Sequence, residues 1–407
     1  MLDGKAGQHI RVGVIGGSIS KGVGASDKKR TDYFNLFCNW LSPLSEASIT
    51  CRNGAVRAST ASFMEICMEN SLDSTVDLVL VEFCLNNAAL DNGHTVYNPV
   101  VRDMERLLRR VLSMRSKPAV IMVKVPTPGI QDFPAPESRL YTNTTEDLEG
   151  ALSSYYDVPT VSLRNSAYQL MDRGKGRRGA GFTWYSTFMN RHPGDAGHRM
   201  LGDLLVGLMQ DTALGLALEP IDEAEDAAWR EALPQPIHPG NTAPLKTLCV
   251  RSEKLPKYVV RADGWEYVDE GDEDNPKPGF VATEPGSVLE LELGTQGFSL
   301  DRSKQLALIL LYLTSYDIMG TAEIKCVSGC KCEPRIIDSV NSRRESQTAL
   351  AELLVPQSDR CRVAVTVLQE TTSNGHKFKV SGLVVKEARP WMAGDHRLSY
   401  ALDRINR

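Results

Sequence analysis

Apolar residues in the first half of the chain form short continuous runs that alternate with stretches of helical spacing. Three runs rich in Val, Ile and Leu are typical of strands buried on both faces of a parallel sheet: residues 10–15, 76–83 and 119–125. Residues 195–209 instead repeat their apolar positions every three or four residues, as amphipathic helices do. This alternation predicts a three-layer α/β domain with a mostly parallel sheet over residues 8–217.

The pattern changes beyond residue 217. Residues 218–245 are rich in acidic residues, Ala and Pro, which is typical of a linker. From residue 246 onward short apolar runs follow one another without helical patterns, and Leu289 and Leu291 alternate with glutamates as in a half-buried strand. We therefore predict an all-β sandwich over residues 246–390, followed by a C-terminal tail at 391–407.

One hairpin is expected inside the sandwich. The apolar runs 363–368 and 378–385 flank Ser373-Asn374-Gly375, whose residue types are typical of a tight turn. The two runs are therefore predicted to pair as neighbouring strands.

Nine cysteines are present, and three of them lie close together: Cys326, Cys330 and Cys332. Their spacing matches no standard pattern of zinc ligands. Two interpretations stay open at this point, namely a disulfide cluster that involves Cys361 or Cys249, and buried free thiols. No metal and no cofactor are expected.

Charge and composition exclude some classes of partner. The 407 residues carry a formal net charge of −5, and 24 % of them are charged, as in ordinary soluble proteins. No dense basic tract is present, so we expect no nucleic-acid partner. Apolar residues recur at helical spacing over residues 99–112, which predicts a helix there. Four arginines cluster on this helix, and we expect them on its solvated outer face: Arg102, Arg106, Arg109 and Arg110.

Hydropathy predicts no membrane span. The N-terminal residues contain no apolar stretch of the kind a signal peptide needs, and the longest apolar run, residues 306–313, is too short to cross a bilayer. Two locations remain open. The chain is expected to be the trimmed part of a protein in the lumen of the secretory pathway or outside the cell, with the cytoplasm as the alternative.

A serine follows the first predicted strand directly. The strand runs into Gly16-Gly17-Ser18, so a tight glycine turn would expose the serine at the carboxyl end of the sheet. We expect a helix to begin there, which would place backbone N–H groups where they stabilise a developing negative charge. The glycine spacing does not match the dinucleotide-binding fingerprint.

A histidine at the far end of the first domain is the candidate base. His192 lies on the loop that enters the helix predicted from residue 195, and such a loop can reach Ser18. Because a free hydroxyl is a weak nucleophile near neutral pH, Ser18 needs a base of this kind. His198, one turn into the helix, is expected to pack or to cap instead.

These segments together resemble the SGNH, or GDSL-like, hydrolases. Four blocks occur in the family's order: Gly16 to Ser20, Asn53-Gly54-Ala55, Val81 to Asn87, and His192-Pro193. Gly17 stands where the family usually has Asp, and Asn87 stands in place of a second Asp. The GGS form and the strand V-E-F-x-x-N further resemble a glycan-associated branch of the family.

The resemblance implies a site and a mechanism. Ser18 would attack an ester carbonyl while His192 takes its proton. The oxyanion would be held by the backbone N–H groups of Ser18 and Gly54 and by the side-chain amide of Asn86, where one such donor is worth on the order of 3 kcal/mol.

The orienting acid of the family is missing. The carboxylate that usually lies three residues before the histidine is replaced by Met189. We therefore expect the Asn190 amide oxygen or a backbone carbonyl to accept the outer imidazole N–H.

The resemblance thus implies an esterase that removes O-acyl groups, in the first place O-acetyl groups, from a carbohydrate. An O-acyltransferase on glycans and a catalytically inactive glycan-binding or scaffold protein are the alternatives. The expected partner is a glycan or another acylated small substrate. The sequence does not indicate an oligomeric state.

Overall fold

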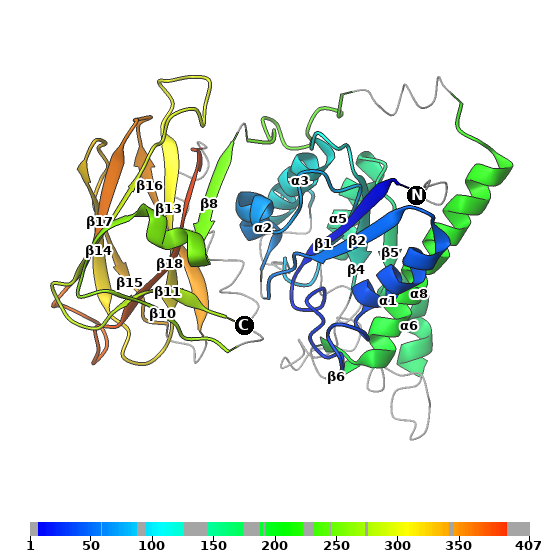
Figure 1. The fold of residues 1–407 in the computed structure, drawn as a ribbon, viewed down its shortest axis with the longest axis horizontal. Helices are drawn as coiled ribbons and strands as arrows, with labels where there is room; N and C mark the ends of the chain where they lie inside the picture. The colour runs from blue at the N-terminus through cyan, green and yellow to red at the C-terminus, as the bar shows by residue number, and fades with distance from the viewer. Residues whose placement is uncertain are drawn as a thin grey trace. The chain divides into compact units, whose positions relative to one another are not determined.

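The computed structural model describes residues 7–57, 59–87, 95–125, 145–173, 188–189, 192–222, 232–244, 246–272, 276–341 and 346–388. The chain divides between residues 243 and 244 into two compact units (Figure 1). The division falls inside the segment 218–245, for which the sequence predicts a linker. The predicted tail at 391–407 lies outside the described residues.

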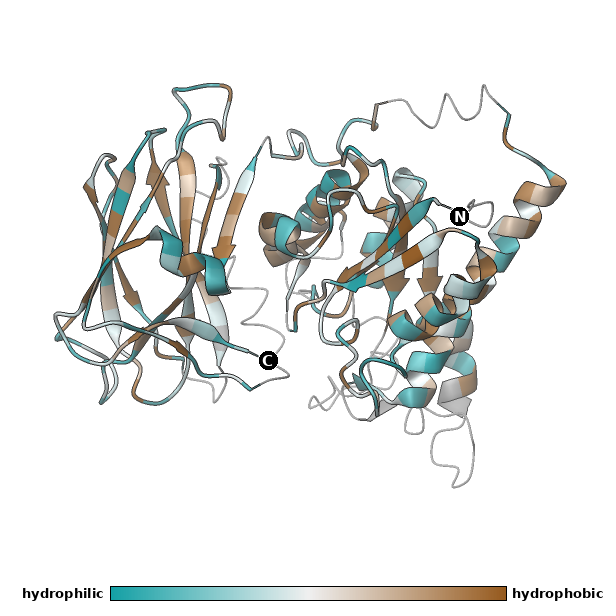
Figure 2. Ribbon diagram, in the orientation of Figure 1, coloured by the Kyte–Doolittle hydropathy of each residue, from teal (hydrophilic) through white to brown (hydrophobic). Residues whose placement is uncertain are grey.

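A parallel five-stranded sheet forms the centre of the first unit. Its strand order is β2-β1-β3-β4-β5, and each neighbouring pair is parallel. The strands are β1 (His9–Gly16), β2 (Ser48–Asn53), β3 (Leu78–Glu82), β4 (Ala119–Lys124) and β5 (Thr160–Ser162). Figure 2 shows the central strands in the brown of apolar residues, as expected for strands covered on both faces.

Helices cover both faces of this sheet. They are α1 (Tyr33–Leu41), α2 (Ala61–Cys67), α3 (Pro99–Leu112), α5 (Glu146–Tyr155), α6 (Leu163–Arg173) and α8 (Asp195–Leu218), with the short 3-10 helices η1 (Ser42–Leu44) and η2 (Met68–Asn70). Residues of α1, α6 and α8 pack with Val12 and Val14 of β1 in one buried cluster. Residues of α2, α3 and α5 pack with Ile15 in another. Alternate residues of β1 therefore face opposite layers, and the predicted three-layer α/β fold is confirmed.

Helix α8 is longer than the sequence pattern predicts. It is the one described helix that is long enough and apolar enough to cross a membrane, by length and composition alone. Its first turns bury Leu201 and Leu205 in the core of the first unit, whereas Leu214 and Leu218 near its end are exposed. Packing on the sheet therefore accounts for the apolar residues of its first half.

The arginines of α3 are not on a solvated face, and that prediction is wrong. Arg106 is only 1 % exposed and lies 3.5 Å from Asp103 and 4.0 Å from Glu65 of α2. Arg109 donates to the Tyr156 hydroxyl at 2.9 Å and to the Pro234 carbonyl at 2.6 Å. The polar face of α3 is thus covered by α2 and by residues from the segment that follows α8.

Glu105 of α3 anchors that segment. Its carboxylate accepts from His238 Nδ1 at 2.7 Å, Asn241 Nδ2 at 2.6 Å and the Ile237 N–H at 2.6 Å. It also accepts from the Tyr156 hydroxyl at 2.7 Å. Burial opposes ionisation of Glu105, but the hydrogen bonds from His238, Asn241 and Tyr156 outweigh it and lower the pKa to about 2.

The second unit is a sandwich of two antiparallel sheets. One sheet has the order β10-β11-β18-β13-β16 with β8 paired to β18, and the other has the order β15-β14-β17-β12-β9. The 3-10 helix η5 (Ser252–Tyr258) follows β8. The strands are β8 (Thr247–Arg251), β9 (Val259–Asp263), β10 (Glu266–Asp269), β11 (Pro278–Ala282), β12 (Val288–Leu293), β13 (Leu306–Thr314), β14 (Thr321–Ser328), β15 (Arg335–Asp338), β16 (Gln347–Val355), β17 (Cys361–Val367) and β18 (Phe378–Glu387).

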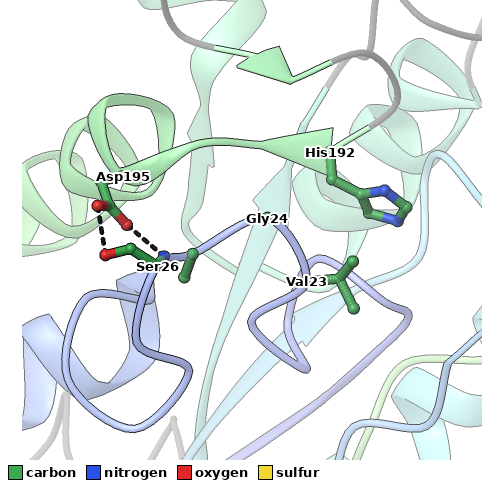
Figure 3. A pocket seen from close by; sticks show the side chains of 6 residues that line it. Val23, Gly24, Ser26, His192 and Asp195 are labelled. Carbon is green, nitrogen blue, oxygen red and sulfur yellow. Dashed lines mark hydrogen bonds between the residues drawn. The ribbon is translucent and has the colours of Figure 1, made fainter.

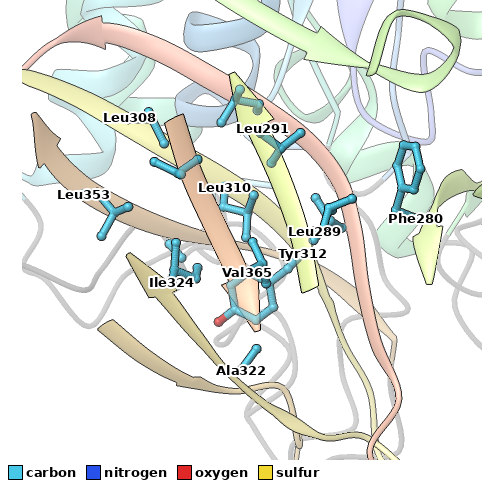
Figure 4. Close-up of a cluster of buried hydrophobic side chains, with 14 of the residues drawn as sticks. Phe280, Leu289, Leu291, Leu308, Leu310, Tyr312, Ala322, Ile324, Leu353 and Val365 are labelled. Atoms are coloured by element: carbon cyan, nitrogen blue, oxygen red, sulfur yellow. The ribbon is translucent and has the colours of Figure 1, made fainter. Parts of the chain in front are cut away.

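The core of the sandwich follows the period-two pattern of the sequence. Leu289 and Leu291 of β12 are buried, while Glu290 between them and Glu292 after them are less buried. Figure 4 shows these leucines gathered with Leu308, Leu310 and Leu353 of the other sheet. The predicted all-β sandwich is confirmed.

The predicted hairpin at Ser373-Asn374-Gly375 is wrong. β17 pairs with β12 and β14, whereas β18 pairs with β11, β13 and β8, so the two strands belong to different sheets. The connection between them packs on the end of the sandwich, where the Thr371 hydroxyl donates to the Met319 carbonyl at 3.3 Å. Turn residues mark a change of direction here but do not determine which strands pair.

The clustered cysteines form disulfides. Cys326 is bonded to Cys332, and Cys330 is bonded to Cys361 at the start of β17. The interpretation as buried free thiols is therefore wrong for these residues. A further disulfide, Cys38–Cys51, joins α1 to β2 in the first unit.

The anchor at Glu105 yields a stability prediction. Glu105→Ala should lower the free energy of unfolding by about 3 kcal/mol, because it leaves several buried donors without an acceptor. The ordinary pKa of Glu is about 4.3 and the folded value is about 2, so ionised Glu105 stabilises the fold above about pH 4. This contribution is lost as the pH falls toward 2.

Urea unfolding of wild type, Glu105→Ala and the exposed-site control Glu46→Gln, measured between pH 7 and pH 3, checks this prediction. A Glu105→Ala variant as stable as the control at pH 7 would contradict it.

Candidate active site

A succession of turns, not a helix, follows β1. The Lys21 N–H donates to the Gly17 carbonyl at 3.1 Å, and the Val23 N–H donates to the Ser18 carbonyl at 3.0 Å. The first helix, α1, begins only at Tyr33. The predicted helix N-terminus at Ser18 is therefore wrong, and any stabilisation of negative charge must come from individual N–H groups.

Ser18 and His192 meet across the first unit. The Nε2 atom of His192 lies 2.8 Å from Ser18 Oγ, although the residues are 174 positions apart in sequence. His192 lies in β7 (His192–Pro193), which pairs with β6 (Phe188–Met189) just before α8. This distance is within the range that a serine and its general base require.

The turn after Ser18 packs directly against the histidine strand. Gly24 has a φ of +97°, and a Cβ atom at this position would lie 2.2 Å from the Pro193 carbonyl oxygen and 3.1 Å from His192 Cβ. Only glycine fits this approach. Gly24 therefore lets the turn lie against the backbone that carries His192.

Asp195 fastens the same turn to α8. Its carboxylate accepts from the Ser26 N–H at 2.8 Å, the Ser26 hydroxyl at 2.6 Å and the Thr31 hydroxyl at 2.8 Å. The hydrogen bonds from Ser26 are the main cause that lowers the pKa of Asp195. Figure 3 shows Asp195 directed at Ser26 and His192 directed elsewhere. Asp195 is thus not the missing orienting acid, although it lies three residues from the histidine.

A cavity of about 450 Å³ lies beside this turn, lined by Val23, Gly24, Ala25, Ser26, His192 and Asp195. It brings one face of the His192 region into contact with solvent. A small substituent of a substrate could enter beside the imidazole at this place.

His198 packs, as predicted, and does not act as a second base. It is fully buried, its Nδ1 accepts the Tyr33 N–H at 3.3 Å, and its Nε2 lies 3.3 Å from the Val23 carbonyl oxygen. These partners require a neutral ring with its proton on Nε2. Burial lowers the pKa of His198, which agrees with that state.

Asn86 lies beside the turn that carries Ser18. A Cβ atom on Gly17 would be 2.1 Å from Asn86 Nδ2, so the amide occupies the space that a side chain at position 17 would need. This explains why glycine stands where the family usually has Asp. One N–H of the amide donates to the Ser59 carbonyl at 2.7 Å, and an amide nitrogen carries two.

Gly54 cannot serve as predicted. Its N–H donates to the Val14 carbonyl at 2.9 Å and so belongs to the hydrogen bonds between β1 and β2. A glycine is needed at position 54 for another reason, since a Cβ atom there would lie 2.0 Å from the Ser71 carbonyl oxygen. The assignment of Gly54 to the oxyanion hole is wrong.

The donors that remain near Ser18 are few. Among the described residues, the Ser18 N–H donates to no backbone carbonyl, and the Asn86 amide has a second N–H besides the one bonded to Ser59. Asn87 has a packing role instead, because its side chain bonds the Ala61 N–H at 3.0 Å and Glu149 at 3.0 Å.

Met189 is the direct strand partner of His192 in the β6–β7 pair. Asn190 lies outside the described residues. The predicted acceptor of the outer imidazole N–H, which is the Asn190 amide or a backbone carbonyl, therefore stays a prediction.

Glu82 lies at the same turn and is not among the site residues predicted from the sequence. Its Oε2 accepts from the N–H groups of Gly17 and Ser20, each at 3.3 Å, and from the Ser20 hydroxyl at 2.9 Å. Burial is the main cause that raises the pKa of Glu82 to about 7, against the opposing hydrogen bonds from Ser20 and Gly17. A signal existed, since a glutamate that ends an otherwise apolar buried strand needs polar partners.

The fold of this chain is similar to that of known two-domain esterases. No model of a protein family matches the sequence, and no curated protein matches it. The crystal structure of a two-domain esterase active on acetylated mannans matches with a TM-score of 0.64 at 18 % identity, over 94 % of this chain and 92 % of that one. A crystal structure of such an esterase co-crystallized with mannopentaose matches with a TM-score of 0.62 at 19 % identity, over 95 % of this chain and 93 % of that one. The chain therefore has the two-domain fold of these esterases, an α/β domain with a parallel sheet followed by a β-sandwich.

Proposed function

We propose that this protein is a serine esterase that removes acetyl groups from a carbohydrate. The observation that carries the proposal is the 2.8 Å contact between Ser18 Oγ and His192 Nε2 at the carboxyl end of the sheet. The shared fold with an esterase active on acetylated mannans supports the choice of substrate class.

The reaction would proceed in two steps. His192 Nε2 takes the proton of Ser18 Oγ while Oγ attacks the acetyl carbonyl carbon, and the Ser18 N–H and Asn86 Nδ2 hold the oxyanion. The bond between that carbon and the sugar oxygen then breaks, and the sugar oxygen takes the proton from the imidazolium. In the second step His192 deprotonates a water molecule, which attacks the carbonyl carbon of the acetyl-serine. The bond between that carbon and Ser18 Oγ breaks, acetate leaves, and Oγ takes back the proton from the imidazolium.

An oxidising location is part of the proposal. Disulfides form and persist mainly in the secretory pathway and outside the cell, and this chain has them in both units. In protein isolated without reductant, alkylation followed by mass spectrometry should leave Cys38, Cys51, Cys326 and Cys332 unmodified. Alkylation of these four thiols without reduction would favour the cytoplasm instead.

Hydrolysis tests the proposed function. Wild type should release acetate from 4-nitrophenyl acetate and from acetylated mannan, and Ser18→Ala and His192→Ala should each lower kcat by about 10³-fold or more. Asn86→Ala should lower kcat by about 100-fold, since it removes one oxyanion donor.

The exposed serine variant Ser113→Ala is the matched control and should keep wild-type rates. Turnover of wild type no faster than that of Ser18→Ala would favour the inactive binding protein. Acetyl transfer to an added sugar in place of acetate release would favour the acyltransferase.

The missing acid gives a separate prediction. Met189→Asp should raise the rate of hydrolysis of a small acetyl ester by about tenfold or more, because loss of such a carboxylate lowers kcat by about 10⁴-fold in serine proteases. Met189→Asn is the control, being similar in shape without the charge. Equal rates of the two variants would show that His192 is already oriented by another group.

A further inference from the structure

A buried carboxylate lies beneath the nucleophile turn. Glu82 is the last residue of β3, its side chain is 0 % exposed, and the residues before it in the strand are apolar. A carboxylate in such surroundings is costly unless hydrogen bonds compensate for the lost water. The compensation comes from the turn that carries Ser18.

The donors to Glu82 bracket the nucleophile. The N–H groups of Gly17 and Ser20, on either side of Ser18 and Ile19, both reach Oε2 at 3.3 Å. The turn is thereby folded around one oxygen atom. Since the N–H groups of Gly17 and Ser20 are directed inward at Glu82, the Ser18 N–H between them is left for another partner.

The turn is held on its other sides as well. A Cβ atom on Gly16 would lie 2.4 Å from Ser20 Oγ and 2.8 Å from the Glu82 carbonyl oxygen, so the turn closes tightly on the end of β3. The Asn53 amide donates to the Ser20 carbonyl at 2.7 Å. Little freedom remains for Ser18 while these contacts persist.

A hydroxyl pair extends the support to α1. The Ser20 hydroxyl donates to Glu82 Oε2 at 2.9 Å and lies 2.7 Å from the Tyr33 hydroxyl. Because the Ser20 proton is directed at the carboxylate, the Tyr33 hydroxyl must be the donor in the second contact. Three elements, β3, the turn and α1, are therefore joined through Oε2 of one residue.

We propose that Glu82 is a positioning residue that holds the Gly17–Ser20 turn so that the Ser18 N–H faces the oxyanion. The inference rests on the proposed esterase function and adds to it a residue that never contacts substrate. The required property is acceptance of hydrogen bonds at Oε2, since Glu82 Oε1 is buried without a partner among the described residues.

The two oxygens of the Glu82 carboxylate differ, because Oε2 accepts the hydrogen bonds and Oε1 has no partner among the described residues. This difference allows a test by substitution. In Glu82→Gln the amide oxygen can take the place of Oε2, and the NH₂ group falls where Oε1 has no partner. Glu82→Ala removes the acceptor. We expect Glu82→Ala to lower kcat by about 100-fold with KM within about threefold, as for a slight misplacement of catalytic groups. Glu82→Gln should restore most of that loss, and Ser20→Ala should lower kcat by a smaller factor than Glu82→Ala.

Glu105→Gln is the matched control, because Glu105 is a buried hydrogen-bonded glutamate of the same unit and should affect stability without lowering kcat. Amide hydrogen exchange supplies a readout that needs no activity. The N–H groups of Gly17 and Ser20 should be protected in wild type and in Glu82→Gln, and they should exchange at least about tenfold faster in Glu82→Ala. If Glu82→Ala fails to fold, kcat and amide hydrogen exchange of wild type, Glu82→Gln and Ser20→Ala decide whether Glu82 positions the turn.

Two results would overturn the inference. The first is a folded Glu82→Ala variant with the kcat of wild type. The second is a Glu82→Gln variant as slow as Glu82→Ala, which would mean that the charge of Glu82 matters and its hydrogen bonds do not. Failure of the esterase proposal has a different signature. In that case wild type is no faster than Ser18→Ala, while the exchange pattern at Gly17 and Ser20 still reports whether Glu82 holds the turn.

Discussion

The contact between the turn after β1 and the backbone before α8 is the constraint on which the candidate site depends. Asp195 fastens the turn through Ser26 and Thr31, and Gly24 lets it lie against Pro193. His198 adds a buried bridge to Val23 and Tyr33. These interactions hold the two ends of the α/β unit together, and the 2.8 Å distance between Ser18 and His192 follows from them.

Two buried glutamates show how local donors decide the state of a carboxylate. Glu105 accepts hydrogen bonds on both oxygens, and they outweigh its burial and lower its pKa to about 2. Glu82 accepts on Oε2 alone, and burial raises its pKa to about 7. Glu105 holds the segment after α8 on α3, and Glu82 lies under the turn that carries Ser18. Both are explained by the number and placement of their donors.

The sequence predicts the layers of the fold and the Ser18–His192 pair because these depend on local patterns. An apolar run that ends in Gly16-Gly17-Ser18 determines where the serine emerges, and the apolar repeat after Asp195 determines where the histidine loop ends. Gly54 could not be assigned correctly, because its N–H belongs to the ladder with Val14, and only the strand register shows that.

Other errors have the same origin in long-range packing. The amphipathic pattern of α3 predicts its arginines in solvent, but Glu65 and Pro234, from distant parts of the sequence, cover Arg106 and Arg109. Turn chemistry at Ser373-Asn374-Gly375 could not show that the chain changes sheets there. Glu82 was overlooked because its partners lie more than 60 residues away in the chain.

In the proposed esterase, the contact with His192 makes Ser18 an activated nucleophile. Labelling with a fluorophosphonate probe, followed by peptide mass spectrometry, tests this activation. We expect a single modified residue, Ser18, in wild type, with labelling at least about tenfold slower in His192→Ala. Modification of another serine, or equal labelling rates in wild type and His192→Ala, would contradict it.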